Sequence, residues 1–452
     1  MRIKTTGGYV EGFEENGLQN FLGIPYARAE RFQAPREINW EGVFQADAFG
    51  KKAVQSHPAQ ETQAGWEGRK EYGEDCLNLN IYVPARDALE ARREGRGLPV
   101  AVYIHGGAFQ NGSNRDRSGK QIIRDHSFIY VSINYRLGVL GYLYLGAALG
   151  EEYRGTGNNG TLDQLAALRW IYDNIGEFGG DRSRITVLGA LLLKPELKTC
   201  CSQVLMASGA YQCIREEETA AAVADSFFSL AGLKRPEDIL TMDVDNLLAV
   251  QERLVDNPGN TCTFGPVADG ITVPMDWREA LRSGRHWSGK AIVGSCRHEM
   301  VFRRLGDPDF TAHCPAIARA LFGQNAEIAI EEFKEFDAGE RQEESGSALR
   351  RALKWEQLLS DYMYRTYSRR LAELLAKNGS QVWYYSMDFG TASHVLDQSA
   401  AFDGAWRDDA LFPGIALEER RKTAEIIYES YVRFFETGDP NWEGIPEWKP
   451  LG

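Results

Sequence analysis

The sequence predicts an α/β fold in which a mostly parallel central sheet is flanked by helices. Residues 98–107 and 128–135 are nearly continuous apolar runs, which is typical of strands buried on both faces. Residues 161–179 carry apolar side chains at helical spacing, and the short β-rich runs 184–189 and 203–209 follow them. Strand, helix, strand, crossover and strand in this order indicate parallel strands joined across a layer of helices.

Other runs are expected to extend this sheet and to form a smaller one. Residues 9–13 and 20–24 predict a small antiparallel sheet near the N-terminus. Residues 77–84 alternate in polarity and stop at a proline, as strands do. The runs 290–295 and 381–387 predict that the chain returns to the central sheet late in the sequence.

The second half of the chain is richer in helices. Residues 216–233 and 348–379 have the amphipathic spacing of helices. No linker rich in Pro, Gly or Ser divides the chain. We therefore predict one domain over residues 1–452, with a mainly helical insertion at roughly 212–375.

The composition excludes several classes of partner. The formal net charge of −13 argues against nucleic acid, because phosphates need basic side chains to displace their counterions. No run of about 18 apolar residues occurs, so we expect no membrane span. The first residues lack the apolar region of a signal peptide. We expect a cytoplasmic monomer.

The cysteines suggest neither a disulfide framework nor a metal centre. Their number is odd and no Cys-x-x-Cys occurs. We therefore expect reduced thiols and no metal site. The seven positions are 76, 200, 201, 213, 262, 296 and 314.

Residues 103–112, YIHGGAFQNG, end the first buried run in a glycine-rich turn. Glycine permits unusual dihedral angles and close approach, so the backbone N–H groups of such a turn can point into a cavity. N–H groups placed in this way stabilise the oxyanion of an acyl-transfer intermediate. A glycine turn without any function after a strand would have the same sequence pattern. This stretch alone therefore leaves open whether the turn is an oxyanion hole or only a structural turn.

Several stretches together resemble the type-B carboxylesterases, the cholinesterase-like branch of the α/β-hydrolases, and in particular their bacterial para-nitrobenzyl-esterase-like members. They follow the order of the family over most of the chain. The resemblance implies an α/β-hydrolase fold and hydrolysis of small-molecule carboxylic esters through an acyl-serine. The matching stretches are FLGIPYA (21–27), EDCLNLNIYVP (74–84), YIHGGAF (103–109), NYRLGVLGYL (134–143), GNNGTLDQLAALRWIYDNIGEFGGD (157–181) and FGPVADG (264–270).

The resemblance also implies roles for individual residues. The backbone N–H groups of Gly107 and Ala108 would form the oxyanion hole. Glu299, in GSCRHEM, corresponds to the acid of the catalytic triad, and His394, in GTASHVLD, to its histidine. Glu299 would fix the tautomer of His394, which would take the proton of the nucleophile and give it to the leaving alcohol.

Two ion pairs follow from the same resemblance. Arg31 would pair with Glu74, and Arg136 with Asp163, as buried pairs that tie loops to the sheet. Removing one partner of such a pair is costly, because the other charge is left buried without compensation.

The nucleophile of the family is missing from this sequence. In the family, the strand that matches 184–189 runs into a Gly-x-Ser-x-Gly elbow, whereas here Gly189 is followed by Ala190 and three leucines. About nine residues, roughly two and a half helical turns, are absent at this junction. No Gly-x-Ser-x-Gly occurs elsewhere, and neither Ser208 nor Cys296 stands in such an elbow.

Two hypotheses remain open. In the first, the chain is a carboxylesterase that has lost its elbow, in the recorded sequence or in the gene, and is inactive or very weak as written. In the second, it is a non-catalytic cholinesterase-like binding protein. In both, the short crossover between 184–189 and 203–209 predicts that little helix remains between these strands.

Overall fold

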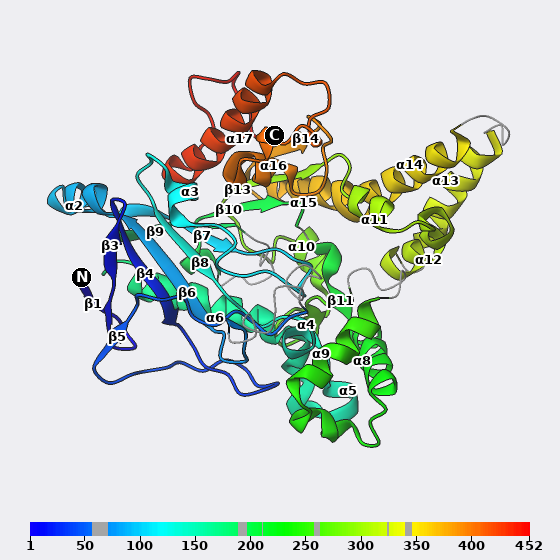
Figure 1. Cartoon of the computed structure of the whole chain (residues 1–452), viewed down its shortest axis with the longest axis horizontal. Coiled ribbons are helices and arrows are strands. Elements are labelled where there is room, and N and C mark those ends of the chain that lie inside the picture. The colour runs from blue at the N-terminus through cyan, green and yellow to red at the C-terminus, as the bar shows by residue number, and fades with distance from the viewer. Residues whose placement is uncertain (57–70, 189–196, 210, 257–262, 323–324, 340–345) are drawn as a thin grey trace.

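The computed structural model describes residues 1–56, 71–188, 197–209, 211–256, 263–322, 325–339 and 346–452. Within these residues the central sheet has nine strands in the order β14-β13-β10-β9-β7-β8-β6-β4-β3 (Figure 1). The six from β14 to β8 are parallel, and the other three are antiparallel to their neighbours. The predicted mostly parallel sheet is confirmed.

The strands of the central sheet lie close to the runs that predicted them. Their bounds are β3 Phe13–Glu15, β4 Leu18–Pro25, β6 Asn78–Pro84, β7 Leu98–Ile104, β8 Ile129–Ile133, β9 Gly180–Leu188, β10 Gln203–Ala207, β13 Lys290–Cys296 and β14 Gln381–Met387.

A small sheet near the N-terminus is formed by β1 (Arg2–Lys4), β2 (Tyr9–Glu11) and β5 (Val43–Gln45). β1 and β2 are antiparallel, whereas β5 is parallel to β2. The run 20–24 does not join this sheet: it lies in β4, which pairs with β6 of the central sheet. The physical reason is burial, since Phe21 and other residues of β4 lie in the core.

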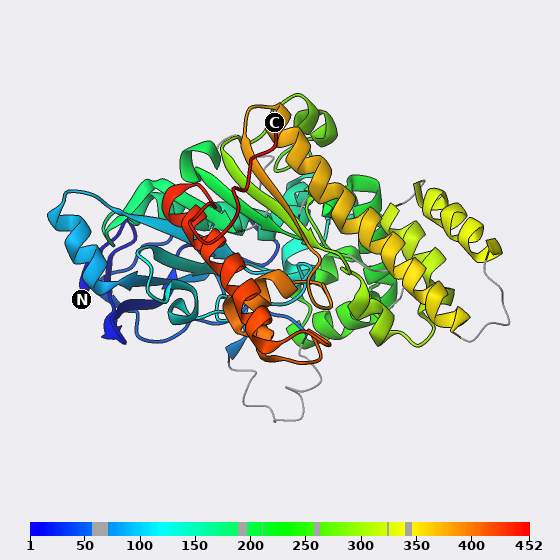
Figure 2. The same ribbon diagram turned by 90° about the horizontal axis from the view of Figure 1, so that it is seen from above.

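Alternate residues of the central strands face two separate cores. On β7, Val100 and Val102 belong to the larger core, whereas Ala101 and Tyr103 belong to the smaller one. Both sets are buried, as expected for a parallel sheet covered on each face. The long helix α17 (Leu417–Thr437) contributes to the smaller core and runs across the sheet in Figure 2.

The helices flank the sheet or belong to the later insertion. The larger core takes apolar residues from α6 and α15, and the smaller one from α3 and α17. The bounds of the helices not yet given are α2 Ala85–Arg93, α3 Gly119–Ile123, α4 Gly138–Tyr142, α5 Gly146–Leu149, α6 Asn159–Asn174, α7 Leu197–Cys200, α8 Glu217–Ala231, α9 Val244–Val255, α10 Trp277–Arg282, α11 Val301–Gly306, α12 Phe310–Phe322, α13 Ala326–Gly339, α14 Ser347–Ser360, α15 Thr366–Lys377 and α16 Leu396–Gln398.

The helices α12, α13 and α14 form an arm at the right of Figure 1. They share a core of their own, in which Trp355 is stacked on Phe333 with ring centroids 4.5 Å apart. The run 348–379, expected as one helix, is α14 and α15 joined through a π-helical turn at Asp361–Arg365.

The crossover from β9 to β10 contains little helix in its described part. Leu188 ends β9, and the chain resumes at residue 197 with α7, which has four residues. The two strands nevertheless pair in parallel, with Thr186 opposite Gln203. The parallel pairing of β9 with β10 is therefore present together with the four-residue helix α7 in the described part of this crossover.

We expect His126 to make stability depend on pH. Its Nε2 lies 3.1 Å from Glu429 Oε1 and its Nδ1 3.4 Å from Glu436 Oε1, which ties α17 to the loop before β8. Burial lowers the pKa of His126, but the hydrogen bonds to Glu436 and Glu429 outweigh burial and raise the pKa above its ordinary value.

Because the folded pKa of His126 is raised, its contribution to stability is full below the unfolded pKa, about 6.5, and is lost as the pH rises through the folded value. His126→Gln should therefore lower the melting temperature at pH 5.5 and leave it nearly unchanged at pH 9. Equal losses at both pH values would show that the contribution of His126 does not depend on its charge.

Candidate active site

A cavity of about 500 Å³ lies at the carboxyl ends of the parallel strands. Leu188 at the end of β9, Ser208 after β10 and His394 after β14 all line it. The turn after β7, from His105 to Gly112, lines it as well. Ligands of α/β sheets bind at this edge, because the loops that follow each strand converge there.

Glu299 and His394 meet at this cavity although 95 positions separate them in the sequence. Glu299 Oε2 lies 2.5 Å from His394 Nδ1. The loops that carry the two residues are joined by a parallel β-bridge between His298 and Ser393, and the His298 N–H donates to the carbonyl of Ala392 at 2.9 Å. The parallel pairing of β13 with β14 therefore continues into the site.

Glu299 is fully buried, and its carboxylate has two further donors. The Ser208 hydroxyl donates to Oε1 at 2.5 Å, and the backbone N–H of Cys296 donates to the same oxygen at 2.7 Å. A buried carboxylate with several donors is held in one orientation. The Ser208 hydroxyl thus helps to orient Glu299 in the Glu299–His394 pair, called the dyad below. Sequence patterns did not reveal this contact.

Only one ring nitrogen of His394 is hydrogen-bonded within the described residues. Its Nδ1 is committed to Glu299, and its Nε2 has no hydrogen-bond partner among the residues described. The rings of Tyr364 and Phe302 lie beside the imidazole, with centroids 5.3 Å and 5.7 Å away. This packing and the Glu299 contact together fix the orientation of the ring.

Gly107 and Ala108 present backbone N–H groups at the same cavity. Neither N–H group is donated to another group in the described part of the chain, and both residues line the cavity. At Gly107 φ is +111°, and an added Cβ would lie 2.1 Å from the carbonyl oxygen of Asn111. Only glycine fits there.

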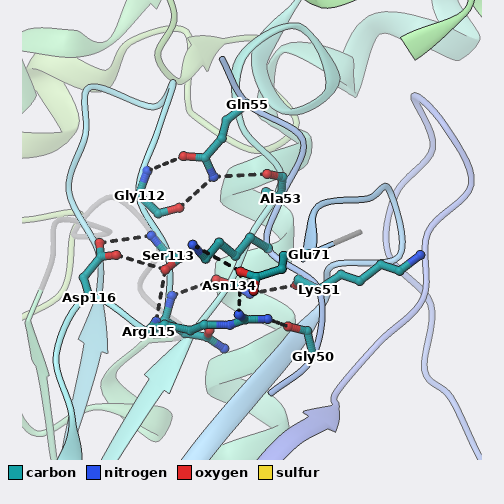
Figure 3. A network of polar contacts seen from close by, with 12 residues as sticks. Gly50, Lys51, Ala53, Gln55, Glu71, Gly112, Ser113, Arg115, Asp116 and Asn134 are labelled. Atoms are coloured by element: carbon teal, nitrogen blue, oxygen red, sulfur yellow. Dashed lines mark hydrogen bonds and ion pairs between the residues drawn. The ribbon is translucent and has the colours of Figure 1, made fainter. Parts of the chain in front are cut away.

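A polar network holds the far end of this turn (Figure 3). The Gln55 side chain accepts from the N–H of Gly112 at 2.9 Å and donates to the carbonyls of Gly112 and Ala53 at 3.0 and 3.1 Å. The carboxylate of Asp116 accepts from the N–H and hydroxyl of Ser113 at 3.0 and 2.9 Å. These contacts anchor the turn that carries Gly107 and Ala108, and Gln55 was not a candidate from the sequence.

Positive φ at non-glycine residues is concentrated around the cavity. Ala108, Phe109, Ser208, Ala392 and Val395 have φ between +45° and +62°. Each such residue costs about 1 kcal/mol or more and persists only where its surroundings fix it. These residues belong to the three loops that carry the candidate groups, which is the pattern of a site held in a set geometry.

The cysteine considered as a substitute nucleophile is unsuited to that role. Cys296 is fully buried, and its thiol lies 3.7 Å from the carboxylate of Asp397. Burial, followed by the charge of Asp397, raises the pKa of the Cys296 thiol far above its ordinary value. A thiol that does not ionise is a poor nucleophile. The junction of Gly189 and Ala190 lies outside the described residues.

The two expected ion pairs are both in contact, but they differ in burial. Asp163 is fully buried and accepts from Arg136 Nε at 2.8 Å and from Nη2 at 2.7 Å. Arg31 Nε donates to Glu74 at 2.8 Å, yet 37% of the Glu74 side chain is exposed. The second pair is therefore not the buried pair that we expected, because its acidic partner remains in solvent.

Comparison with known proteins agrees with this geometry. A protein-family model with the description "Carboxylesterase family" matches residues 1–452. The chain belongs to this family.

Two bacterial enzymes illustrate the relationship of this carboxylesterase-family chain to characterised proteins. The para-nitrobenzyl esterase of Bacillus subtilis is 27% identical over 472 residues, covering 98% of this chain and 91% of that protein. The phenmedipham hydrolase of Pseudarthrobacter oxydans is also 27% identical, with the same coverage. The solved carboxylesterase of Geobacillus stearothermophilus at pH 6.2 has a TM-score of 0.79 at 31% identity, covering 99% of this chain and 93% of that one.

The similar structures confirm the predicted α/β-hydrolase fold of this carboxylesterase-family chain. Within the described ranges, no helix is both long and apolar enough to cross a membrane. No group of three or more His, Cys, Asp or Glu residues is placed to hold a metal ion in the same part of the chain.

The strain at Ser208 predicts an unusual order of stability among its variants. Both Ser208→Ala and Ser208→Gly lose the hydroxyl that donates to Glu299. With φ at +56°, alanine bears a cost of about 1–2 kcal/mol that glycine does not. We expect the glycine variant to require more urea for unfolding than the alanine variant. The reverse order would mean that the residue relaxes out of the left-handed region.

Proposed function

We propose that this cavity binds small carboxylic esters and that the chain as written hydrolyses them only very weakly. The observation that carries this proposal is the Glu299–His394 pair beside two free backbone N–H groups, in a chain without the Gly-x-Ser-x-Gly elbow. The relatives named esterases and hydrolases support the ester as substrate class.

Each candidate group has a defined task in this proposal. The carbonyl oxygen of the ester would accept from the N–H groups of Gly107 and Ala108, which stabilise the negative charge that develops there. His394 Nε2 would accept a proton from the attacking group and return it to the leaving alcohol. Glu299 would hold the His394 tautomer and stabilise its charged form.

The missing serine decides the rate. With a serine, the reaction would proceed through an acyl-enzyme, but no nucleophile of this kind is available in the described site, because the Ser208 hydroxyl is bonded to Glu299. His394 can then act only on water. The remaining donors give some catalysis over the uncatalysed reaction, orders of magnitude below that of a complete triad.

A second candidate function is a non-catalytic binding protein. The cavity of about 500 Å³ and its strained loops persist in a sequence without the elbow, which favours selection for binding over turnover.

For either function we propose a monomer in the cytoplasm that needs no cofactor. A single peak at the monomer mass by light scattering supports this state, and a dimer mass contradicts it.

The proposal is tested by measuring binding and turnover separately. Saturation of the protein by 4-nitrophenyl acetate, with a slow rate that falls to background in His394→Ala, supports a weak esterase. Binding of benzyl methyl ketone, a non-hydrolysable analogue, without any ester turnover above background supports the binding protein. If the protein shows no binding of either compound and no turnover, the proposed ester site itself is overturned.

A further inference from the structure

A second groove shares the lining residue Tyr211 with the candidate ester cavity. It has a volume of about 440 Å³ and is lined by Tyr211, Arg282, Arg370, Glu373, Leu374 and Lys377. Tyr211 lines the ester cavity as well. The groove thus runs between the end of α10 and one side of α15, which are in contact.

The cations of this groove are largely uncompensated. Arg370 and Lys377 form no ion pair or hydrogen bond with any residue in the described part of the chain. Glu373 is already bonded to Arg369 at 2.9 Å, and Arg282 has only an exposed contact with Glu279 at 3.7 Å. In a chain with a net charge of −13, three cations around one groove mark a local excess of positive charge.

The groove residues of α15 lie on one side of the helix. Positions 370, 373, 374 and 377 recur at intervals of three and four residues, so they share one face of α15. Arg282, at the end of α10, lines the same groove. An anion between the two helices would therefore meet cations from both sides.

One aromatic side chain, Tyr211, lines the groove. The Tyr211 ring lies 5.5 Å from Trp277 and 5.2 Å from Tyr367, so both neighbours support it. Burial raises the pKa of Tyr211, while the charges of Arg370 and Arg282, which line the same groove, act in the opposite direction. Tyr211 and Leu374 offer an apolar surface beside the positive charges.

We propose that this groove is a second binding site, which takes small organic carboxylates that carry an apolar or aromatic group. The carboxylate lies between Arg282, Arg370 and Lys377, since guanidinium and ammonium groups form charge-assisted hydrogen bonds with it. The apolar group lies on Tyr211 and Leu374. Binding at this groove does not require turnover in the ester cavity. The proposal is therefore independent of the proposed esterase function.

The test uses benzoate as the probe and calorimetry as the measurement. The double variant R370Q/K377Q removes two cations of the groove, and R421Q/K422Q removes the same two residue types from exposed positions on α17. We expect R370Q/K377Q to bind benzoate about tenfold more weakly than the parent and R421Q/K422Q to bind it equally well. Matching melting temperatures would confirm that both variants fold.

Benzamide, which has the same ring without the charge, provides the second arm. We expect it to bind at least tenfold more weakly than benzoate. Equal benzoate affinity in R370Q/K377Q and the parent would overturn the proposal, because the probe would then occupy another site such as the ester cavity. Equal affinities of benzamide and benzoate, or no binding of benzoate by the parent, would overturn it as well.

Discussion

Inserting nine residues that contain a Gly-x-Ser-x-Gly elbow between Gly189 and Ala190 is expected to raise kcat/KM for 4-nitrophenyl acetate by about 10³-fold or more. The physical reason is that the other proposed groups are already in place: Glu299 lies 2.5 Å from His394, and no described residue accepts from the N–H groups of Gly107 and Ala108. Serine would supply an acyl-enzyme route that water cannot match. The segment can be taken from the Bacillus subtilis esterase, and initial rates measure the effect.

Two matched variants make this prediction specific. The same insertion with alanine in place of the serine restores chain length without the nucleophile, and it should leave the rate at the level of the parent. The insertion combined with His394→Ala should lose the gain, because the serine would have no base. A gain that persists in either variant would contradict the role assigned to the dyad.

Replacing Asp163 by alanine is expected to destabilise the fold by about 3–5 kcal/mol. Asp163 has no exposed surface, and it holds both Arg136 Nε and Nη2. The variant leaves a guanidinium buried without its partner, and the melting temperature should fall by several degrees. Differential scanning calorimetry measures this shift.

An exposed ion pair gives the control for that measurement. The side chains of Arg86 and Glu90 are 86% and 49% exposed, so Glu90→Ala should change the stability by less than about 1 kcal/mol. The double variant R136M/D163L removes both charges and should be more stable than Asp163→Ala alone. Equal melting temperatures for Asp163→Ala and the parent would show that the pair carries no such energy.

Much of the fold could be predicted because the strands of the parallel sheet are apolar on both faces. The runs at 98–107 and 128–135 became β7 and β8 for this reason, since every residue of both strands is buried. The antiparallel pairing expected between the runs 9–13 and 20–24 is found at Phe13 and Asn20, but in the central sheet and not in the small one. Pairing partners depend on burial by distant residues. Phe21 packs edge-to-face on Phe178, 157 positions away, with ring centroids 4.9 Å apart.

The candidate site was only partly visible in the sequence. Motifs gave Glu299 and His394, but nothing in the local pattern shows that the Ser208 hydroxyl donates to Glu299 or that Gln55 holds Gly112. Such contacts join loops that come together only through the sheet. Backbone strain is equally hidden, because Ala108 and Val395 are ordinary residues until their positive φ is seen.

Covalent labelling with a fluorophosphonate tests the central claim most directly, since this reagent modifies the activated serine of a hydrolase. The intact mass of the chain, compared with that of the Bacillus subtilis para-nitrobenzyl esterase treated in parallel, reports the result. We expect the chain to keep its unmodified mass, because the sequence has no Gly-x-Ser-x-Gly elbow and the Ser208 hydroxyl is bonded to Glu299. One phosphonate adduct per chain would contradict the account, and its position, at Ser208 or elsewhere, would identify the nucleophile.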